Sequence, residues 1–151
     1  MISLSKRSLD RLSGVHPDLV RVVKRAATMA ADVQDFTVVE GVRSREQMCA
    51  NYGQGRTAAE CLAKGVAARF SDPAKAKVTW LANPLLSSHR IHPDGFGHAV
   101  DLAPFPIDWA DHARFRTLGG LIKQAAAAET VVLAWGGDWA RPDMPHFELI
   151  S

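Results

Sequence analysis

Several features are scarce in this chain of 151 residues, and each scarcity excludes a class of protein. The two cysteines, Cys49 and Cys61, form no Cys-x-x-Cys pair, which argues against a disulfide framework or a zinc finger and favours free thiols in a reducing compartment. No apolar run reaches the length of a signal peptide or the roughly 20 residues of a transmembrane helix. The net charge of +2 is too small to indicate a nucleic-acid-binding surface.

The remaining composition is that of a globular domain. With 47% hydrophobic and 23% charged residues, the chain can bury a core without disulfide bonds. We therefore expect a single soluble domain over residues 1–151, with no stable insertion into a membrane.

Hydrophobic spacing and capping residues indicate helices that alternate irregularly with short strands. The expected helices cover residues 17–31, 44–54 and 108–129, the last capped near Asp108. The expected strands cover residues 36–40, 77–82, 98–104, 130–137 and 146–150. Residues 55–70 are ambiguous. Because strands and helices do not alternate regularly, we predict an α+β fold with a small, mainly antiparallel sheet and packed helices.

The residues that indicate chemistry are histidines and acidic residues. Asp101 lies within an apolar strand, where an unpaired carboxylate would be costly, so it requires a metal ion, an arginine or several N–H donors. His146 begins the last strand, and a catalytic zinc site typically has three protein ligands and one water molecule. His89 and His92, in the loop before Asp101, are alternative third ligands. His98 is a poor one, because residues three apart on a strand face opposite sides.

Asp143 precedes His146 by three residues, and Pro145 between them indicates a turn. Such a turn brings the Asp143 carboxylate near a metal without making it a ligand. This is a suitable place for a general base that takes a proton from an activated water molecule.

These residues form an ordered set of motifs that resembles a known family. The motifs are Ser87-Ser88-His89, Gly97-His98-Ala99-Val100-Asp101 and Asp143-Met144-Pro145-His146-Phe147. In this order they resemble the zinc peptidases that cleave peptidoglycan stem peptides. This family includes phage L-alanyl-D-glutamate endopeptidases (endolysins) and D-alanyl-D-alanine carboxypeptidases and dipeptidases. Further segments, among them Val39-Glu40-Gly41-Val42-Arg43-Ser44 and Trp135-Gly136-Gly137-Asp138-Trp139, resemble the phage branch.

The resemblance implies a fold like that of Hedgehog proteins and D,D-peptidases, and a role for each matching residue. His89, Asp101 and His146 would hold Zn²⁺, and Asp143 would act as the general base. Because the segment between His89 and Asp101 is longer here than in many relatives, His92 remains an alternative ligand.

Two further residues match positions that bind substrate in the family. Arg43 would bind a substrate carboxylate or the polarised carbonyl oxygen through its planar guanidinium group. Ser87 would form a hydrogen bond to the substrate.

The expected function is hydrolysis of an amide bond in the stem peptide of peptidoglycan, with the L-Ala–D-Glu bond as the first choice. The alternatives are a D-Ala–D-Ala carboxypeptidase and a zinc-binding module of the same fold without catalytic activity. We expect a monomer that is made in the host cytoplasm without a signal peptide and acts on the cell wall after its release.

Overall fold

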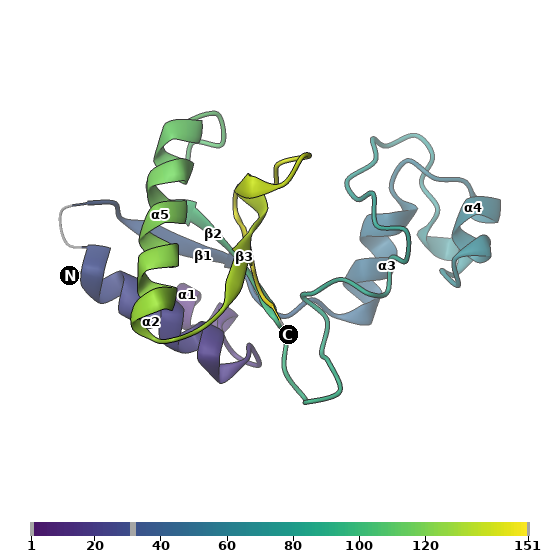
Figure 1. Cartoon of the computed structure of the whole chain (residues 1–151). Coiled ribbons are helices and arrows are strands. Elements are labelled where there is room, and N and C mark those ends of the chain that lie inside the picture. Colours follow the sequence, from purple (N-terminus) through teal and green to yellow (C-terminus); the bar gives the residue numbers. More distant parts are fainter. Residues whose placement is uncertain (1, 31–32, 151) are drawn as a thin grey trace. The chain divides into compact units, whose positions relative to one another are not determined.

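The computed structural model describes residues 2–30 and 33–150 and contains short helices, one longer helix and a single sheet (Figure 1). The α-helices are α1 (Lys6–Arg11), α2 (Pro17–Ala30), α3 (Arg45–Gly53), α4 (Ala58–Ala63) and α5 (His112–Ala128). The strands are β1 (Phe36–Glu40), β2 (Ala99–Pro104), β3 (Leu133–Trp135) and β4 (His146–Leu149). Two 3₁₀ helices, η1 (Ala68–Phe70) and η2 (Gly136–Asp138), complete the described elements.

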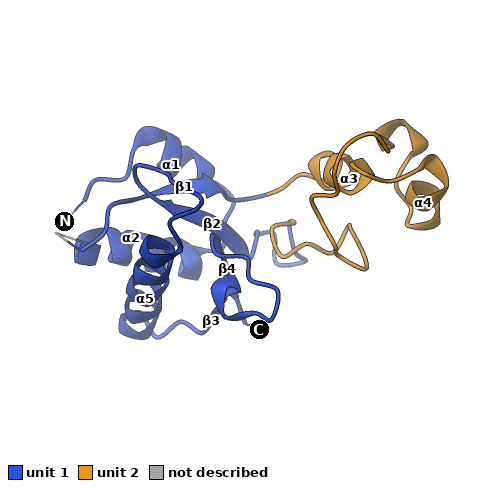
Figure 2. Ribbon diagram, turned by 90° about the horizontal axis from the view of Figure 1, so that it is seen from above, with its two compact units in different colours: residues 1–42, 91–151 blue, residues 43–90 orange. Residues whose placement is uncertain are grey.

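The chain divides into two compact units, which Figure 2 shows in different colours. Unit 1 contains residues 1–42 and 91–151, and unit 2 contains residues 43–90. The prediction of a single domain over residues 1–151 is not decided by this division and stays a prediction.

The sheet belongs to unit 1 and has the strand order β1-β2-β4-β3, with every neighbouring pair antiparallel. This confirms the predicted α+β class and its small antiparallel sheet. In β2, Val100 and Leu102 are fully buried in the core, while Asp101 between them is only partly buried. Because successive side chains of a strand point to opposite faces, Asp101 lies on the face away from this core.

Helices α2 and α5 contact each other, and α5 also contacts β2 and β3. Their apolar faces meet the inner face of the sheet in one cluster that includes Leu19, Val22, Leu118, Ile122 and Phe147. This cluster holds the two central strands, β2 and β4, in place, and these strands carry the site described below.

Unit 2 has its own small cluster of buried side chains. Cys49, Tyr52, Cys61 and Val66 pack together, and both cysteines are free thiols, as predicted. Arg56 is only 7% exposed; its guanidinium lies 4.0 Å from the centre of the Tyr52 ring and donates hydrogen bonds to the carbonyl oxygens of Tyr52 and Thr79. The buried Arg56 is thus paired, and its bond to Thr79 holds the irregular segment that follows α4.

One predicted strand is wrong. Residues 77–82, all of which the structure describes, contain no strand. The side chains of Val78, Trp80 and Leu81 are 52%, 56% and 42% exposed, so the apolar residues that suggested a strand have no sheet to pack against. An apolar segment of this length becomes a strand only when a neighbouring strand accepts its backbone hydrogen bonds.

Element ends also differ from the prediction. Helix α5 begins after Asp111, whose carboxylate accepts a hydrogen bond from Arg114 N, and not near Asp108. Strand β3 covers only Leu133–Trp135 of the predicted 130–137, because its last glycines belong to η2. Helix α1 was not anticipated, and residue 31 of the helix predicted over 17–31 lies outside the described residues.

Among the described residues, every helix is too short or too polar to span a lipid bilayer.

Candidate metal centre

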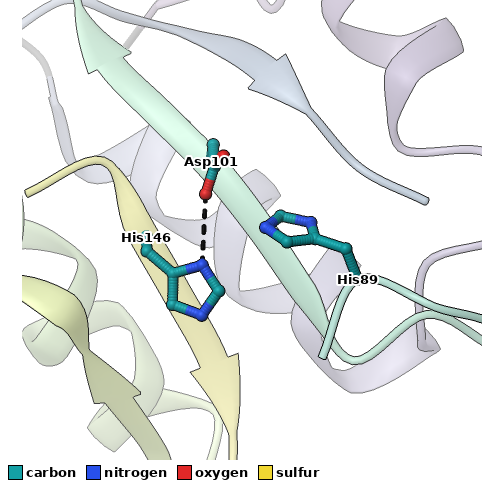
Figure 3. Close-up of side chains that lie close together, drawn as sticks. All are labelled: His89, Asp101 and His146. Atoms are coloured by element: carbon teal, nitrogen blue, oxygen red, sulfur yellow. Dashed lines mark hydrogen bonds and ion pairs between the residues drawn. The ribbon is translucent and has the colours of Figure 1, made fainter. Parts of the chain in front are cut away.

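Asp101 and His146 form the centre of the site. They are directly opposed in the antiparallel pairing of β2 with β4, so their side chains leave the same face of the sheet. The distance from His146 Nδ1 to Asp101 Oδ1 is 3.3 Å (Figure 3). His146 is buried, with 6% of its surface exposed. The strand carboxylate that the sequence marked as needing a partner is therefore placed beside an imidazole.

His89 lies in the last residues of unit 2, two positions before the chain enters unit 1 at Ile91. It is 2% exposed, its N–H donates to Ser87 Oγ at 3.2 Å, and its carbonyl oxygen accepts from Arg43 N at 2.9 Å. Arg43 also donates from its guanidinium to Ser87 Oγ at 3.3 Å. The Ser-x-His motif thus fixes the backbone of His89 through the serine oxygen.

His89, Asp101 and His146 each offer one ligand atom, and these atoms lie within 4.8 Å of one another (Figure 3). Two imidazole nitrogens and one carboxylate oxygen form a donor set that suits zinc and leaves a coordination position for water or substrate. The residues present therefore fit a catalytic metal ion. Their assignment as ligands stays a prediction.

The other histidines of the 87–102 segment lie in a separate arrangement within unit 1. The rings of His92 and His98 stack with their centres 3.7 Å apart, and His98 Nε2 lies 2.7 Å from Asp94 Oδ2. Asp94 also accepts a hydrogen bond from Phe96 N, as expected of a turn residue. His92, the alternative ligand, thus lies against His98, whereas His89 is grouped with Asp101 and His146.

A carboxylate that the sequence reasoning missed lies on the other side of His146. Glu148 follows His146 by two positions on β4, so both side chains lie on one face, and its Oε2 is 3.7 Å from His146 Nε2. Alternation along the strand could have revealed it. Burial lowers the pKa of His146, but the interactions with Asp101 and Glu148 raise it more, to about 9. A metal ion bound by His146 must therefore displace a proton at neutral pH.

Asp143 lies in the turn that leads into β4, as its spacing from His146 predicted. The carbonyl oxygen of Asp143 accepts from His146 N at 3.1 Å, and Asp143 N donates to Gly136 O at 2.9 Å. The side chain of Asp143 is exposed, whereas His146 is buried. The turn thus places an exposed carboxylate three residues before the buried His146, an arrangement that suits a general base.

Gly136 lies against this turn so closely that only glycine fits. A Cβ atom there would overlap Asp143 O and lie 3.1 Å from the Cβ atoms of both Asp143 and His146. The backbone of η2 therefore supports both residues directly.

A small antiparallel sheet that carries two histidines and one aspartate, with an exposed carboxylate in the adjoining turn, suits a metal-dependent hydrolase such as a metallopeptidase. A profile of the family described as phage L-alanyl-D-glutamate peptidase matches residues 1–150. The chain therefore belongs to the phage L-alanyl-D-glutamate peptidase family, which confirms the resemblance seen in the sequence and the prediction of a peptidase.

Individual relatives agree with this family. The L-alanyl-D-glutamate peptidase of Escherichia phage T5 is 28% identical over 147 residues, which cover 95% of this chain and 86% of that protein. The crystal structure of the L-Ala D-Glu endopeptidase ChiX of Serratia marcescens matches with a TM-score of 0.62 and 27% identity, over 97% of this chain and 89% of that one.

A more distant solved structure shares the fold. The vancomycin-resistance D,D-pentapeptidase VanY, from a VanB-type resistance cassette, was solved as an E175A mutant in complex with Zn(II). It matches with a TM-score of 0.54 and 19% identity, over 100% of this chain and 80% of that one. This likeness confirms the predicted D,D-peptidase-like fold.

The raised pKa of His146 predicts how the stability of the metal-free protein depends on pH. The protonated ring favours the folded state fully below the unfolded pKa of 6.5, and this contribution is lost as pH rises to about 9. We expect the free energy of unfolding, measured with denaturant in the presence of a chelator, to fall across this range. His146→Gln should flatten the dependence, and His112→Gln, at an exposed helix position, should not. A free energy of unfolding that stays constant between pH 6.5 and about 9 would contradict the raised pKa of His146.

The close packing of Gly136 predicts that Gly136→Ala displaces the turn. We expect a loss of about 1–3 kcal/mol in the free energy of unfolding, as for other overpacked sites, and at least a tenfold lower affinity for a divalent metal ion. Gly120→Ala is the matched control: a Cβ at Gly120 meets nothing within 4 Å, and alanine there should stabilise α5 by roughly 0.5–1 kcal/mol. Unchanged stability and metal affinity in Gly136→Ala would show that a Cβ at this position does not displace the turn.

Proposed function

We propose that this chain is a zinc-dependent peptidoglycan endopeptidase that hydrolyses the L-alanyl–D-glutamate bond of stem peptides. The observation that carries the proposal is the grouping of the His89, Asp101 and His146 ligand atoms within 4.8 Å, with Asp143 in the turn that ends at His146. The family and the activities named for the T5 and ChiX proteins support the choice of bond.

In this proposal His89, Asp101 and His146 hold the zinc ion, and Glu148 orients the His146 ring from its other nitrogen. When bound, zinc would polarise the scissile carbonyl and lower the pKa of a water molecule to about 7. Asp143 accepts the proton that the attacking water gives up and donates it to the leaving amine. The exposed position of Asp143 suits this role, because a carboxylate in contact with solvent can exchange its proton between steps.

Arg43 and Ser87 would bind the substrate. The guanidinium of Arg43 presents five N–H donors in one plane, a geometry that suits the carboxylate of D-glutamate or the carbonyl oxygen at the cleaved bond. Ser87 accepts hydrogen bonds from His89 N and from Arg43, so its oxygen fixes their relative position while its proton can be donated to substrate.

The proposal also covers the assembly and the place of action. We infer a monomer, because the three ligands and Asp143 come from one copy of the chain. The family profile matches residues 1–150, which supports one catalytic domain. As a phage-type enzyme, it would be made in the host cytoplasm and would reach the peptidoglycan after release.

The bond cleaved is tested by incubating purified stem peptide with the zinc-loaded protein and identifying the products by mass spectrometry. We expect a fragment ending at L-alanine, and Asp143→Asn should retain zinc but lower kcat by about 10²- to 10⁴-fold. Release of the terminal D-alanine would instead identify a carboxypeptidase. Stoichiometric zinc without any hydrolysis would identify a binding module, and full activity in Asp143→Asn would eliminate Asp143 as the base.

The ligand assignment is tested by zinc analysis of His89→Ala beside His92→Ala. We expect His89→Ala to lose zinc, because one of three protein ligands is missing, and His92→Ala to keep one zinc per chain. The two variants are a matched pair, since both remove an imidazole from the same loop. Loss of zinc in His92→Ala alone would reverse the assignment while leaving the family unchanged.

A further inference from the structure

The turn before β4 is held at three successive carbonyl oxygens. Asp143 O accepts from His146 N, Met144 O accepts from the indole Nε1 of Trp135 at 2.7 Å, and Pro145 O accepts from Leu102 N at 2.8 Å. The first and third bonds come from the backbone. The bond to Met144 comes from a side chain, so it is the one of these three that a substitution can remove.

Trp135 is placed for this contact by its own strand. It is the last residue of β3, is 7% exposed, and is paired in register with Phe147 of β4. The two rings lie nearly parallel, with 17° between their planes and 6.3 Å between their centres. The indole therefore packs beside β4 while its N–H reaches back to the turn that precedes this strand.

The surroundings of the indole restrict its orientation. A Cβ on Gly119 of α5 would lie 2.8 Å from Trp135 Cε2, and a Cβ on Gly137 would overlap the same ring. The ammonium group of Lys123 lies 5.3 Å from the ring centre and 2.6 Å from Asp138 Oδ2. Helix α5 and η2 thus enclose the ring closely, and the direction of its N–H is set by packing on two sides.

We propose that Trp135 is a positioning residue for the reaction. Through Met144 O, its indole N–H fixes the turn so that the Asp143 carboxylate and the His146 imidazole keep the separation that proton transfer next to a bound metal requires. Trp135 acts on the backbone of the turn and touches neither substrate nor metal. This inference rests on the proposed function, but its effect on metal binding can be measured separately.

Trp135→Phe tests the proposal, because phenylalanine keeps an aromatic ring and removes the N–H. We expect a folded, zinc-binding variant whose kcat on stem peptide falls by about 10- to 100-fold while KM stays within about twofold, since a small displacement of a reacting group affects turnover. We also expect zinc to transfer to a chelator about tenfold faster, because His146 ends the loosened turn.

Two control variants separate positioning from general loss of stability. Val22→Ala removes a fully buried side chain of α2 and should destabilise the protein while kcat and zinc release stay at the wild-type values. Trp109→Phe removes an indole N–H from a residue that is 55% exposed and should change neither quantity. Wild-type kcat and zinc release in Trp135→Phe, or equal losses in Val22→Ala, would overturn the proposal.

A measurement on the wild-type protein covers the case in which Trp135→Phe does not fold. The indole N–H of Trp135 should exchange with solvent more slowly than that of Trp109, and its ¹H–¹⁵N resonance should shift when zinc is added. Fast exchange together with an unshifted resonance would overturn the inference. If the wild-type protein holds zinc but hydrolyses no stem peptide, the proposed function fails, and zinc release from Trp135→Phe still decides the role of Trp135.

Discussion

The site depends on the antiparallel register between β2 and β4. In such a pairing, directly opposed residues project from one face with their Cβ atoms about 4.5–5.5 Å apart, so the backbone itself brings Asp101 to His146. A slip of one residue would turn one of the two side chains into the core. The next pair, Val100 with Phe147, is fully buried on the opposite face and resists such a slip. Hydrophobic packing on one face of the sheet thus fixes the positions of Asp101 and His146 on the other face.

The turn before β4 carries Asp143, the proposed acid–base group. Asp143 is exposed, whereas His89 and His146 are buried, so the surrounding protein encloses both imidazoles while the proposed base remains accessible to solvent. The turn keeps this difference because its carbonyl oxygens are all occupied and because Gly136 allows the backbone of η2 to approach. The proposed base therefore lies on a turn whose backbone is held by hydrogen bonds and close packing.

Much of the fold was predictable from local patterns. Apolar periodicity located α2 and the central strands, and a charge within an apolar strand identified Asp101 as a functional candidate. The strand predicted over residues 77–82 was wrong, because local apolar character does not reveal whether a neighbouring strand is present. Glu148 was missed although it lies two residues after His146 on the same strand. The contact of Trp135 with the turn before β4 could not be predicted, because strand pairing and packing bring the two together.

The amino-acid sequence alone determined which side-chain types could bind a metal, the turn at Pro145 and the peptidase family. These features depend on residue identity and on order along the chain. The sequence left open whether His89 or His92 accompanies Asp101 and His146, since a loop has no periodicity that assigns its side chains to a face. In the structure, the ligand atoms of His89, Asp101 and His146 lie within 4.8 Å of one another, whereas His92 stacks on His98. The backbone of His89 is held partly by Arg43, which is distant in sequence, so the placement of His89 depends on a contact that local patterns do not reveal.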